Sequence, residues 1–203
     1  YANPSNMFTV MYGASGSSLH EINYGGGTGW AYAANLHRFY TASNQTTGTG
    51  TERMRISSEG YVTTLQQPRF HANGSPSLRN DSTFGNEIAY SFSTVEHNNG
   101  SHYNNSTGLF TVPVTGMYFF GASLWCTASS ANNGNTYALL VRADSNGSNQ
   151  KQFAGANHTH SYNSLQLAAT VYCTVGQRVW VQAYNFTPQG STPRNYFSGF
   201  LAG

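Results

Sequence analysis

The chain has 203 residues, of which only 8% are charged, and its formal net charge is +2. Ordinary soluble proteins carry about 25% charged residues, but a disordered chain would lack the aromatic and β-branched side chains that are abundant here. The arginines are scattered and no apolar run is long enough to cross a bilayer, so neither nucleic-acid binding nor membrane insertion is expected. The composition favours a β protein with a neutral polar surface.

Residues 1–66 are rich in Gly, Ser and Tyr and show no helical periodicity. They contain the glycine-rich run Gly25–Gly29, which we interpret as a turn because no Lys-Ser or Lys-Thr pair follows it, as a phosphate-binding loop requires. The chain starts at Tyr1 and not at Met, so we expect it to be the C-terminal part of a longer protein. We predict that residues 1–66 form a β-rich segment.

The stretch Thr51–Thr64, "TERMRISSEGYVTT", predicts a β-hairpin. Its first half alternates polar and apolar residues, and "SSEG" supplies the turn. The stretch resembles the segment "ERMRI-x-x-x-G-x-V" near the ends of bacteriophage tail-fibre and tail-spike shafts, in the residues from Glu52 to Ile56 and in Gly60 and Val62. In that family the segment belongs to intertwined, trimeric β-structure. The resemblance implies that residues 1–66 are a fibre shaft or neck.

A second region, residues 67–203, begins near Pro68, which interrupts strand pairing. It contains short strand-like runs separated by Gly, Asn and Ser turns. Their number and spacing predict an antiparallel sandwich or jelly roll. The predicted strands are residues 87–95, 108–114, 116–126, 136–143, 165–175, 177–186 and 196–203.

The predicted strand Gly116–Cys126 is apolar on both faces. Met117 and Phe119 lie on one face, and Tyr118 and Phe120 lie on the other, because successive side chains of a strand point in opposite directions. One face can fill the sandwich core. The other face needs a second partner, for which a neighbouring subunit is the natural candidate.

Four blocks of residues 67–203 resemble the C1q/TNF-like domain. "STGLFTVPVTGMYFFGASL" is similar to the family signature "STGxFTxPVxGxYxFxxxL", "GQRVWVQAY" to its "GDxVWLQ" strand, "YFSGFLAG" to its closing "FSGFLL", and "RFHANGS" to its opening "FSA" strand. The matching signature positions are Ser106, Thr107, Gly108, Phe110, Thr111, Pro113, Val114, Gly116, Tyr118, Phe120 and Leu124.

This resemblance implies an all-β fold, a ten-strand jelly roll that assembles as a compact homotrimer. It also implies that Gly116 and Gly199 are packing and turn positions. The family has no enzymatic activity and recognises other molecules by its outer surface and loops. The residues it places in the core or the trimer interface are Phe110, Tyr118, Phe120, Leu124, Trp180, Phe197 and Phe200.

No catalytic site is expected. The seven acidic residues are spread thinly, with no two close enough in sequence to propose a paired acid and base, and no G-x-S-x-G or H-E-x-x-H motif is present. The cysteines, Cys126 and Cys173, lie in apolar stretches. A disulfide is one reading, and two buried free thiols are the favoured one.

The segment Asn157–Asn163, "NHTHSYN", is a candidate metal site. In an extended segment His158 and His160 point to the same side. Three copies around a threefold axis would present six imidazoles, which suit a transition metal such as Fe, Ni, Cu or Zn. The alternative is a polar surface loop with two ordinary histidines. The C1q-like family often binds calcium near this place, but the required acids are missing here.

Contacts with a receptor are expected in four loops, residues 96–107, 127–137, 142–152 and 184–196, because loops carry binding more often than strands do. Exposed Tyr and Asn can stack on sugars and hydrogen-bond to them, although the same residues also form ordinary connections. The candidate contact residues are His102, Tyr103, Asn104, Asn132, Asn133, Asn146, Arg194 and Tyr196.

Together the two resemblances favour a trimeric phage tail-fibre tip, located in the virion, that binds a host-cell surface receptor. The receptor would be a glycan or an outer-membrane component. One alternative is a virion decoration protein or trimerisation cap without receptor binding. Another is a secreted C1q-like lectin or adhesin. A hydrolase is disfavoured because no cluster of carboxylates is present.

Overall fold

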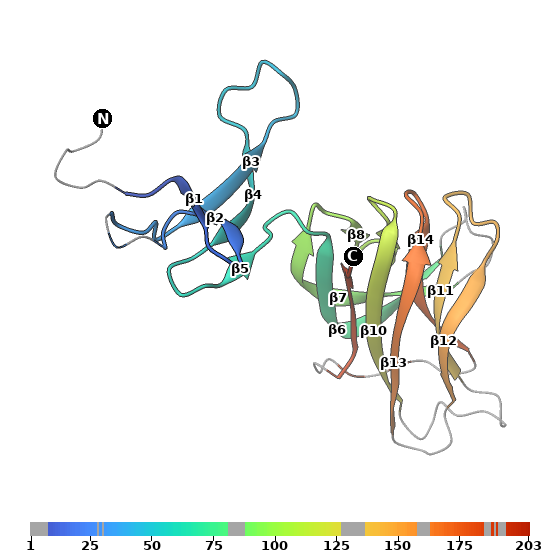
Figure 1. The fold of residues 1–203 in the computed structure, drawn as a ribbon. Coiled ribbons are helices and arrows are strands. Elements are labelled where there is room, and N and C mark those ends of the chain that lie inside the picture. Colours follow the sequence, from blue (N-terminus) through green and yellow to red (C-terminus); the bar gives the residue numbers. More distant parts are fainter. Residues whose placement is uncertain are drawn as a thin grey trace. The chain divides into compact units, whose positions relative to one another are not determined.

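The computed structural model describes residues 8–27, 29, 31–80, 88–126, 137–157, 163–184, 188, 190 and 194–203. All regular structure in these ranges is β-strand (Figure 1), and no helix there could span a membrane. The chain forms two compact units, Tyr1–Gln66 (unit 1) and Gln67–Gly203 (unit 2).

Unit 1 contains two small antiparallel sheets. In one, β1 (Met11–Ser15) pairs with β2 (His20–Tyr24). In the other, β4 (Thr51–Ile56) lies between β3 (His37–Thr41) and β5 (Val62–Thr63). The predicted hairpin of Thr51–Thr64 is confirmed as the β4–β5 pair, and its turn contains Gly60 with a φ of 83°.

The described part of unit 1 has almost no core of its own. Among its described residues no hydrophobic side chain is buried, and Val10, Tyr24 and Tyr61 are 71%, 67% and 70% exposed. In the β3-β4-β5 sheet, Glu52 forms ion pairs with two arginines. Its Oε1 pairs with Arg55, and its Oε2 lies 3.5 Å from Nε of Arg38. Two- and three-stranded sheets without an apolar core are marginally stable in water.

In the described part of unit 2, ten strands form two five-stranded antiparallel sheets, as the jelly-roll prediction requires. The first sheet has the order β13-β10-β15-β6-β7 and the second has the order β12-β11-β14-β9-β8. The strands of the first sheet are β6 (Arg69–Asn80), β7 (Ile88–Asn99), β10 (Gly116–Cys126), β13 (Asn163–Cys173) and β15 (Tyr196–Leu201). Those of the second are β8 (Tyr103–Asn104), β9 (Leu109–Thr111), β11 (Tyr137–Ala143), β12 (Lys151–Asn157) and β14 (Arg178–Tyr184).

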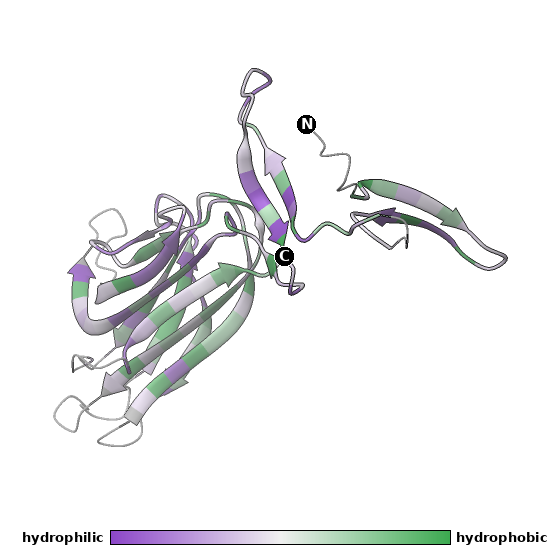
Figure 2. Cartoon of the chain, turned by 90° about the vertical axis from the view of Figure 1, so that its left-hand side faces the viewer, coloured by the Kyte–Doolittle hydropathy of each residue, from purple (hydrophilic) through white to green (hydrophobic). Residues whose placement is uncertain are grey.

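The main core lies between the two sheets and is rich in aromatic rings. Phe70 is central, because its ring stacks on Tyr103 and Phe110 with centroid distances of 4.8 and 4.9 Å and meets Phe197 edge-on at 4.8 Å. This core forms because the inward-pointing residues, every second one along strands such as β10 and β14, are apolar. Figure 2 shows apolar segments on strands of unit 2. The predicted core residues that it buries are Phe110, Tyr118, Phe120, Leu124 and Phe197, all 0% exposed.

Trp180 is also buried, at 1% exposure, but it belongs to a second apolar cluster. Its neighbours on β14, Val179 and Val181, point into the main core, so Trp180 points out of the opposite face of the second sheet. Ala89 of β7 belongs to the same cluster. The β6–β7 hairpin therefore starts at the edge of the first sheet and reaches the outer face of the second. The other members of the Trp180 cluster are Leu109, Leu139, Val141 and Ala143.

Gly199 and Gly116 occupy positions where a side chain does not fit. A Cβ on Gly199 would lie 2.5 Å from Cδ1 of Phe120, and one on Gly116 would lie 2.8 Å from Cδ1 of Leu201. Both glycines therefore allow close packing against an apolar side chain, as the resemblance implies.

The two cysteines lie at opposite ends of the β10–β13 pair. Cys126 is opposite Asn163, whereas Cys173 is opposite Gly116. Ten residues of strand separate these positions, about 33 Å at about 3.3 Å per residue. A bridge between them within one chain is therefore excluded, and Cys173 is a buried free thiol.

Candidate functional site

The outer face of the first sheet carries an exposed apolar patch, formed by Met117, Phe119, Tyr172 and Phe200. Met117 is opposite Tyr172, and Phe119 is opposite Phe200 with the ring centroids 5.3 Å apart. Met117, Tyr172 and Phe200 are 40%, 55% and 45% exposed, and Phe119 is half-buried. This is the second apolar face that the sequence of Gly116–Cys126 predicts. The structure places Phe200 in this patch and not in the core.

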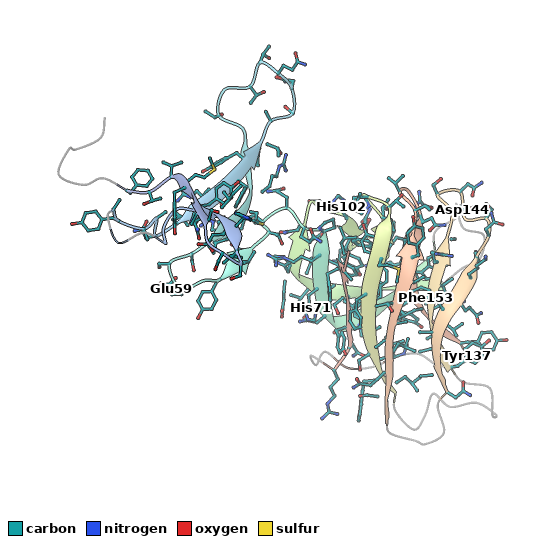
Figure 3. The ribbon with its side chains drawn as sticks, in the orientation of Figure 1. Glu59, His71, His102, Tyr137, Asp144 and Phe153 are labelled. Atoms are coloured by element: carbon teal, nitrogen blue, oxygen red, sulfur yellow. The ribbon has the colours of Figure 1, made fainter. Side chains whose placement is uncertain are left out.

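Beside the apolar patch, β6 and β7 place a polar cluster on the same outer face. Asn73 donates a hydrogen bond of 2.6 Å to Oε1 of Glu96, and Nε2 of His71 lies 3.9 Å from Oε2 of that carboxylate. Nε of Arg69 donates to Nε2 of His97 at 2.8 Å. The apolar patch therefore lies at one end of the β10, β13 and β15 strands, and the polar cluster lies on β6 and β7 of the same sheet (Figure 3, where His71 is labelled).

Two predicted receptor contacts, Arg194 and Tyr196, lie at or near the beginning of β15. The guanidinium of Arg194 lies 4.3 Å from the ring of Trp125, a cation–π contact. Between them in sequence, the buried Asn195 accepts a hydrogen bond from the backbone N–H of Trp125 at 2.7 Å. The half-buried Tyr196 packs against His71, with the rings 5.8 Å apart. Arg194 is exposed and open to a partner.

Tyr103 does not contact solvent, so the expectation that it binds a receptor is wrong. Its side chain is 3% exposed and stacks on Phe70. The side-chain amide of Asn98 fixes it there, because it donates to the carbonyl of Tyr103 at 2.8 Å and accepts from its N–H at 3.1 Å. Burial raises the pKa of the Tyr103 phenol far above its usual range.

His102 and Asn104, on either side of Tyr103, have structural partners. The His102 ring meets Phe110 edge-on at 6.3 Å, and partial burial lowers its pKa below the usual value. Gly100, with a φ of 73°, makes room for this ring, since a Cβ there would lie 2.3 Å from Nε2 of His102. Oδ1 of Asn104 accepts hydrogen bonds from the N–H and Oγ of Ser106 at 2.9 and 2.6 Å, which closes a turn.

Asn146 also closes a turn, because its Oδ1 accepts from the N–H of Ser148 at 3.0 Å and from its Oγ at 2.7 Å. In the same loop Asp144 accepts from the amides of Asn149 and Gln177 at 2.7 and 3.1 Å. These hydrogen bonds, led by the one from Asn149, lower the pKa of Asp144. The loop is held by its own contacts, and Asn146 remains accessible at its surface.

The remaining predicted sites fall outside the described residues: Asn132 and Asn133 of the loop before β11, and His158 and His160 of the proposed metal site. Within the described ranges, no three His, Cys, Asp or Glu side chains gather as metal ligands. The described carboxylates of Glu52, Glu96 and Asp144 each have structural hydrogen-bonding or ionic partners.

A pair of tyrosines on the outer face of the second sheet was missed by sequence reasoning. Tyr137 of β11 is directly opposite Tyr184 of β14, and their rings stack with centroids 4.9 Å apart and an angle of 15° between planes. The signal available in the sequence was that each tyrosine lies where a strand meets a candidate receptor loop. Their cross-strand pairing depends on strand order, which the sequence alone does not show.

The chain is similar to known proteins of one domain family. The C1q domain family matches residues 75–202 of the chain. Among solved structures, the globular domain of zebrafish complement 1qA protein is 18% identical and has a TM-score of 0.47, over 68% of this chain and 98% of that chain. C1q domains commonly form trimers and bind ligands, and the family is in general not enzymatic. Because the family match covers more than half of its residues, the chain belongs to the C1q domain family.

Proposed function

We propose that this chain is the distal end of a bacteriophage tail fibre, a homotrimer that binds a host-cell surface receptor during adsorption. The observation that carries the proposal is the lack of buried hydrophobic side chains in the described part of unit 1. Those strands need cover from outside the chain, and copies of the same segment, intertwined around a common axis, supply it. The resemblance of Thr51–Thr64 to phage fibre shafts supports the same arrangement.

Unit 2 supports trimer formation independently. The apolar patch of Met117, Phe119, Tyr172 and Phe200 lies on the open face of a five-stranded sheet whose other face is fully used by the core. An exposed group of large apolar side chains of this kind marks an interaction surface. We propose a neighbouring C1q domain as the partner, because a closed ring repeats one contact between two different surfaces around its axis.

The proposed mechanism is adhesion. Three identical heads on one fibre, and several fibres on one particle, convert weak contacts into strong attachment, because each later contact forms at a high effective concentration. Exposed polar positions such as Asn146 and Arg194 leave the surface of unit 2 suited to a glycan or an outer-membrane component.

Light scattering of the purified chain tests the trimer first. A mass of three times 22.0 kDa supports the proposal, and a stable monomer contradicts it. Adsorption of a phage that carries this fibre tests the binding function. Free trimer added before infection should block adsorption in proportion to its concentration. A trimer that leaves adsorption unchanged, but whose deletion stops fibre assembly, would instead identify a trimerisation cap.

A further inference from the structure

The stacked tyrosines Tyr137 and Tyr184 form an aromatic platform on the outer face of the second sheet. Tyr184 is 47% exposed, and the side chain of Tyr137 points away from the sandwich (Figure 3). Tyr137 also packs against the buried cluster that contains Trp180 and Leu139. The platform therefore has a fixed base, and a ligand that binds it does not have to order two mobile side chains.

Two amide side chains lie beside the platform, one on the neighbouring strand β12 and one on β14 itself. Asn157 of β12 is directly opposite Tyr137 and is exposed. Gln182 lies two residues before Tyr184 on the same face of β14 and is half-buried, whereas Ala183 between them points into the core. Each amide offers two N–H donors and a carbonyl acceptor.

Next to the platform, Gly155 of β12 makes room for a side chain of the neighbouring strand. It is exposed and lies directly opposite Leu139, and a Cβ there would be 3.1 Å from Cδ2 of Leu139. The Leu139 side chain therefore packs over Gly155 and lines the surface beside Tyr137.

Across β12, β11 and β14 the outward-pointing residues form two rows of cross-strand neighbours, and no residue in either row carries a formal charge. The first row is Asn157, Tyr137 and Tyr184, and the second is Gly155, Leu139 and Gln182. A charged ligand would find no counter-charge there, and Leu139, which is 8% exposed, adds too little apolar area for an apolar protein partner. Ring faces with amides beside them match a pyranose, which has an apolar face and a rim of hydroxyl groups.

We propose that Tyr137, Tyr184, Asn157 and Gln182 form a binding site for a neutral saccharide. A sugar ring stacks on the exposed face of Tyr184 and exchanges hydrogen bonds with Gln182, and a second sugar unit of the same ligand reaches Asn157 on the other side of Tyr137. This inference rests on the proposed receptor-binding function and gives the class of the receptor. The site and the apolar patch lie on different sheets, so covering the patch does not by itself cover the site.

The test uses the full chain, fluorescently labelled, on an array of neutral oligosaccharides with uronic-acid and sulfated oligosaccharides as comparison. We expect wild type to bind neutral oligosaccharides. Tyr184→Ala should weaken binding about two- to thirteenfold, since aromatic contacts contribute about 0.5–1.5 kcal/mol, whereas Tyr184→Phe should retain most of the affinity. Gln152→Ala, on the exposed outer surface of β12 but away from the platform, is the matched control and should bind as wild type.

Binding of wild type that Tyr184→Ala and Tyr137→Ala leave unchanged overturns this site while leaving receptor binding intact. Binding only to charged oligosaccharides, or to none, also overturns it. If no oligosaccharide binds, blocking of phage adsorption still separates the two proposals. Protease removes surface proteins and periodate oxidises glycans. A free trimer that blocks adsorption to protease-treated cells, but not to periodate-treated cells, points to a glycan bound elsewhere on the chain. A trimer that blocks neither contradicts the proposed function itself.

Discussion

Gly199 leaves the space that two core rings of its own sheet, Phe120 and Phe70, occupy. Its Cα lies under the Phe120 ring, and a Cβ would also come within 3.0 Å of Cε1 of Phe70. We expect Gly199→Ala to lower the free energy of unfolding by about 1–3 kcal/mol, because overpacking forces buried rings out of their rotamers. Urea unfolding monitored by fluorescence measures this change.

Gly121→Ala is the control for that experiment. Gly121 is in the same sheet, on β10, but the nearest atom to an added Cβ is Cε1 of Phe119 at 3.5 Å, an ordinary contact. Its stability should stay within about 1 kcal/mol of wild type. Equal losses in both variants would show that the Phe120 contact is not what excludes a side chain at Gly199.

His102 makes the stability of unit 2 depend on pH. Burial lowers its folded-state pKa below the unfolded value of about 6.5, so the unfolded chain binds the proton more readily. The contribution is fully present above the unfolded pKa and is lost as pH falls toward the folded-state pKa. We expect the free energy of unfolding to decrease from pH 8 to pH 5, and to decrease less in His102→Gln.

An NMR titration of the His102 ring protons measures the same property directly, and its midpoint should lie below 6.5. A midpoint at or above that value would contradict the role given to burial here. It would also show that the edge-on contact between His102 and Phe110 does not exclude water from the imidazole.

At the scale of single strands, the sequence predicts β10 well. Tyr118, Phe120 and Leu124 enter the core as expected, because the strand's alternation is a local property that tertiary contacts do not override. Tyr103 is different. It lies between the polar residues His102 and Asn104, which indicate a loop, and only the distant Phe70 explains why its ring is buried.

The path of the β6–β7 hairpin could not be predicted either. Its register shifts between His71 and Ala72 and again between Asn73 and Pro76. Bulges of this kind bend and twist a hairpin, and here the hairpin reaches Trp180 on the other sheet. A sequence pattern of period two shows which residues alternate, but not where a strand bends. The Tyr137–Tyr184 platform was missed because the pattern also does not show which strands lie side by side.

The register of β10 against β13 predicts that the two thiols of one chain are not bonded to each other. Because Cys126 and Cys173 lie at opposite ends of that pair, each chain should keep both thiols free of a bond to the other. Alkylation with iodoacetamide in denaturant, without reductant, should add two labels per chain by mass spectrometry. Under native conditions Cys173 should react slowly, since it is buried and burial raises its pKa. A tryptic peptide pair joined through Cys126 and Cys173 would contradict the register.

At the scale of the whole molecule, the two units pose different problems of stability. Unit 2 has its own aromatic core, but the described strands of unit 1 bury no hydrophobic side chain. In a trimer, contacts between subunits would cover both the exposed hydrophobic side chains of unit 1 and the apolar patch of unit 2. Its stability would then depend on protein concentration, because association stabilises the folded state by mass action.

Phe200→Glu tests this coupling, because it places a charge in the apolar patch, where Phe200 is 45% exposed. The fold of unit 2 should survive, since the side chain lies outside the core, but burying an unpaired charge between subunits should shift the mass from trimer toward monomer. Limited trypsin digestion should then cut unit 1 at Arg38 and Arg55 in the variant and not in the wild-type trimer, because these strands lose their cover.

Val175→Glu is the matched control. Val175 is 64% exposed in the same unit but follows β13 in a turn outside the patch. It should remain trimeric and resist trypsin as wild type does. If Phe200→Glu also stayed trimeric and resistant, the patch would not be the subunit contact. If it became monomeric while unit 1 stayed resistant, the strands of unit 1 would be stable without partner copies, and the argument from their exposed side chains to an intertwined shaft would fail.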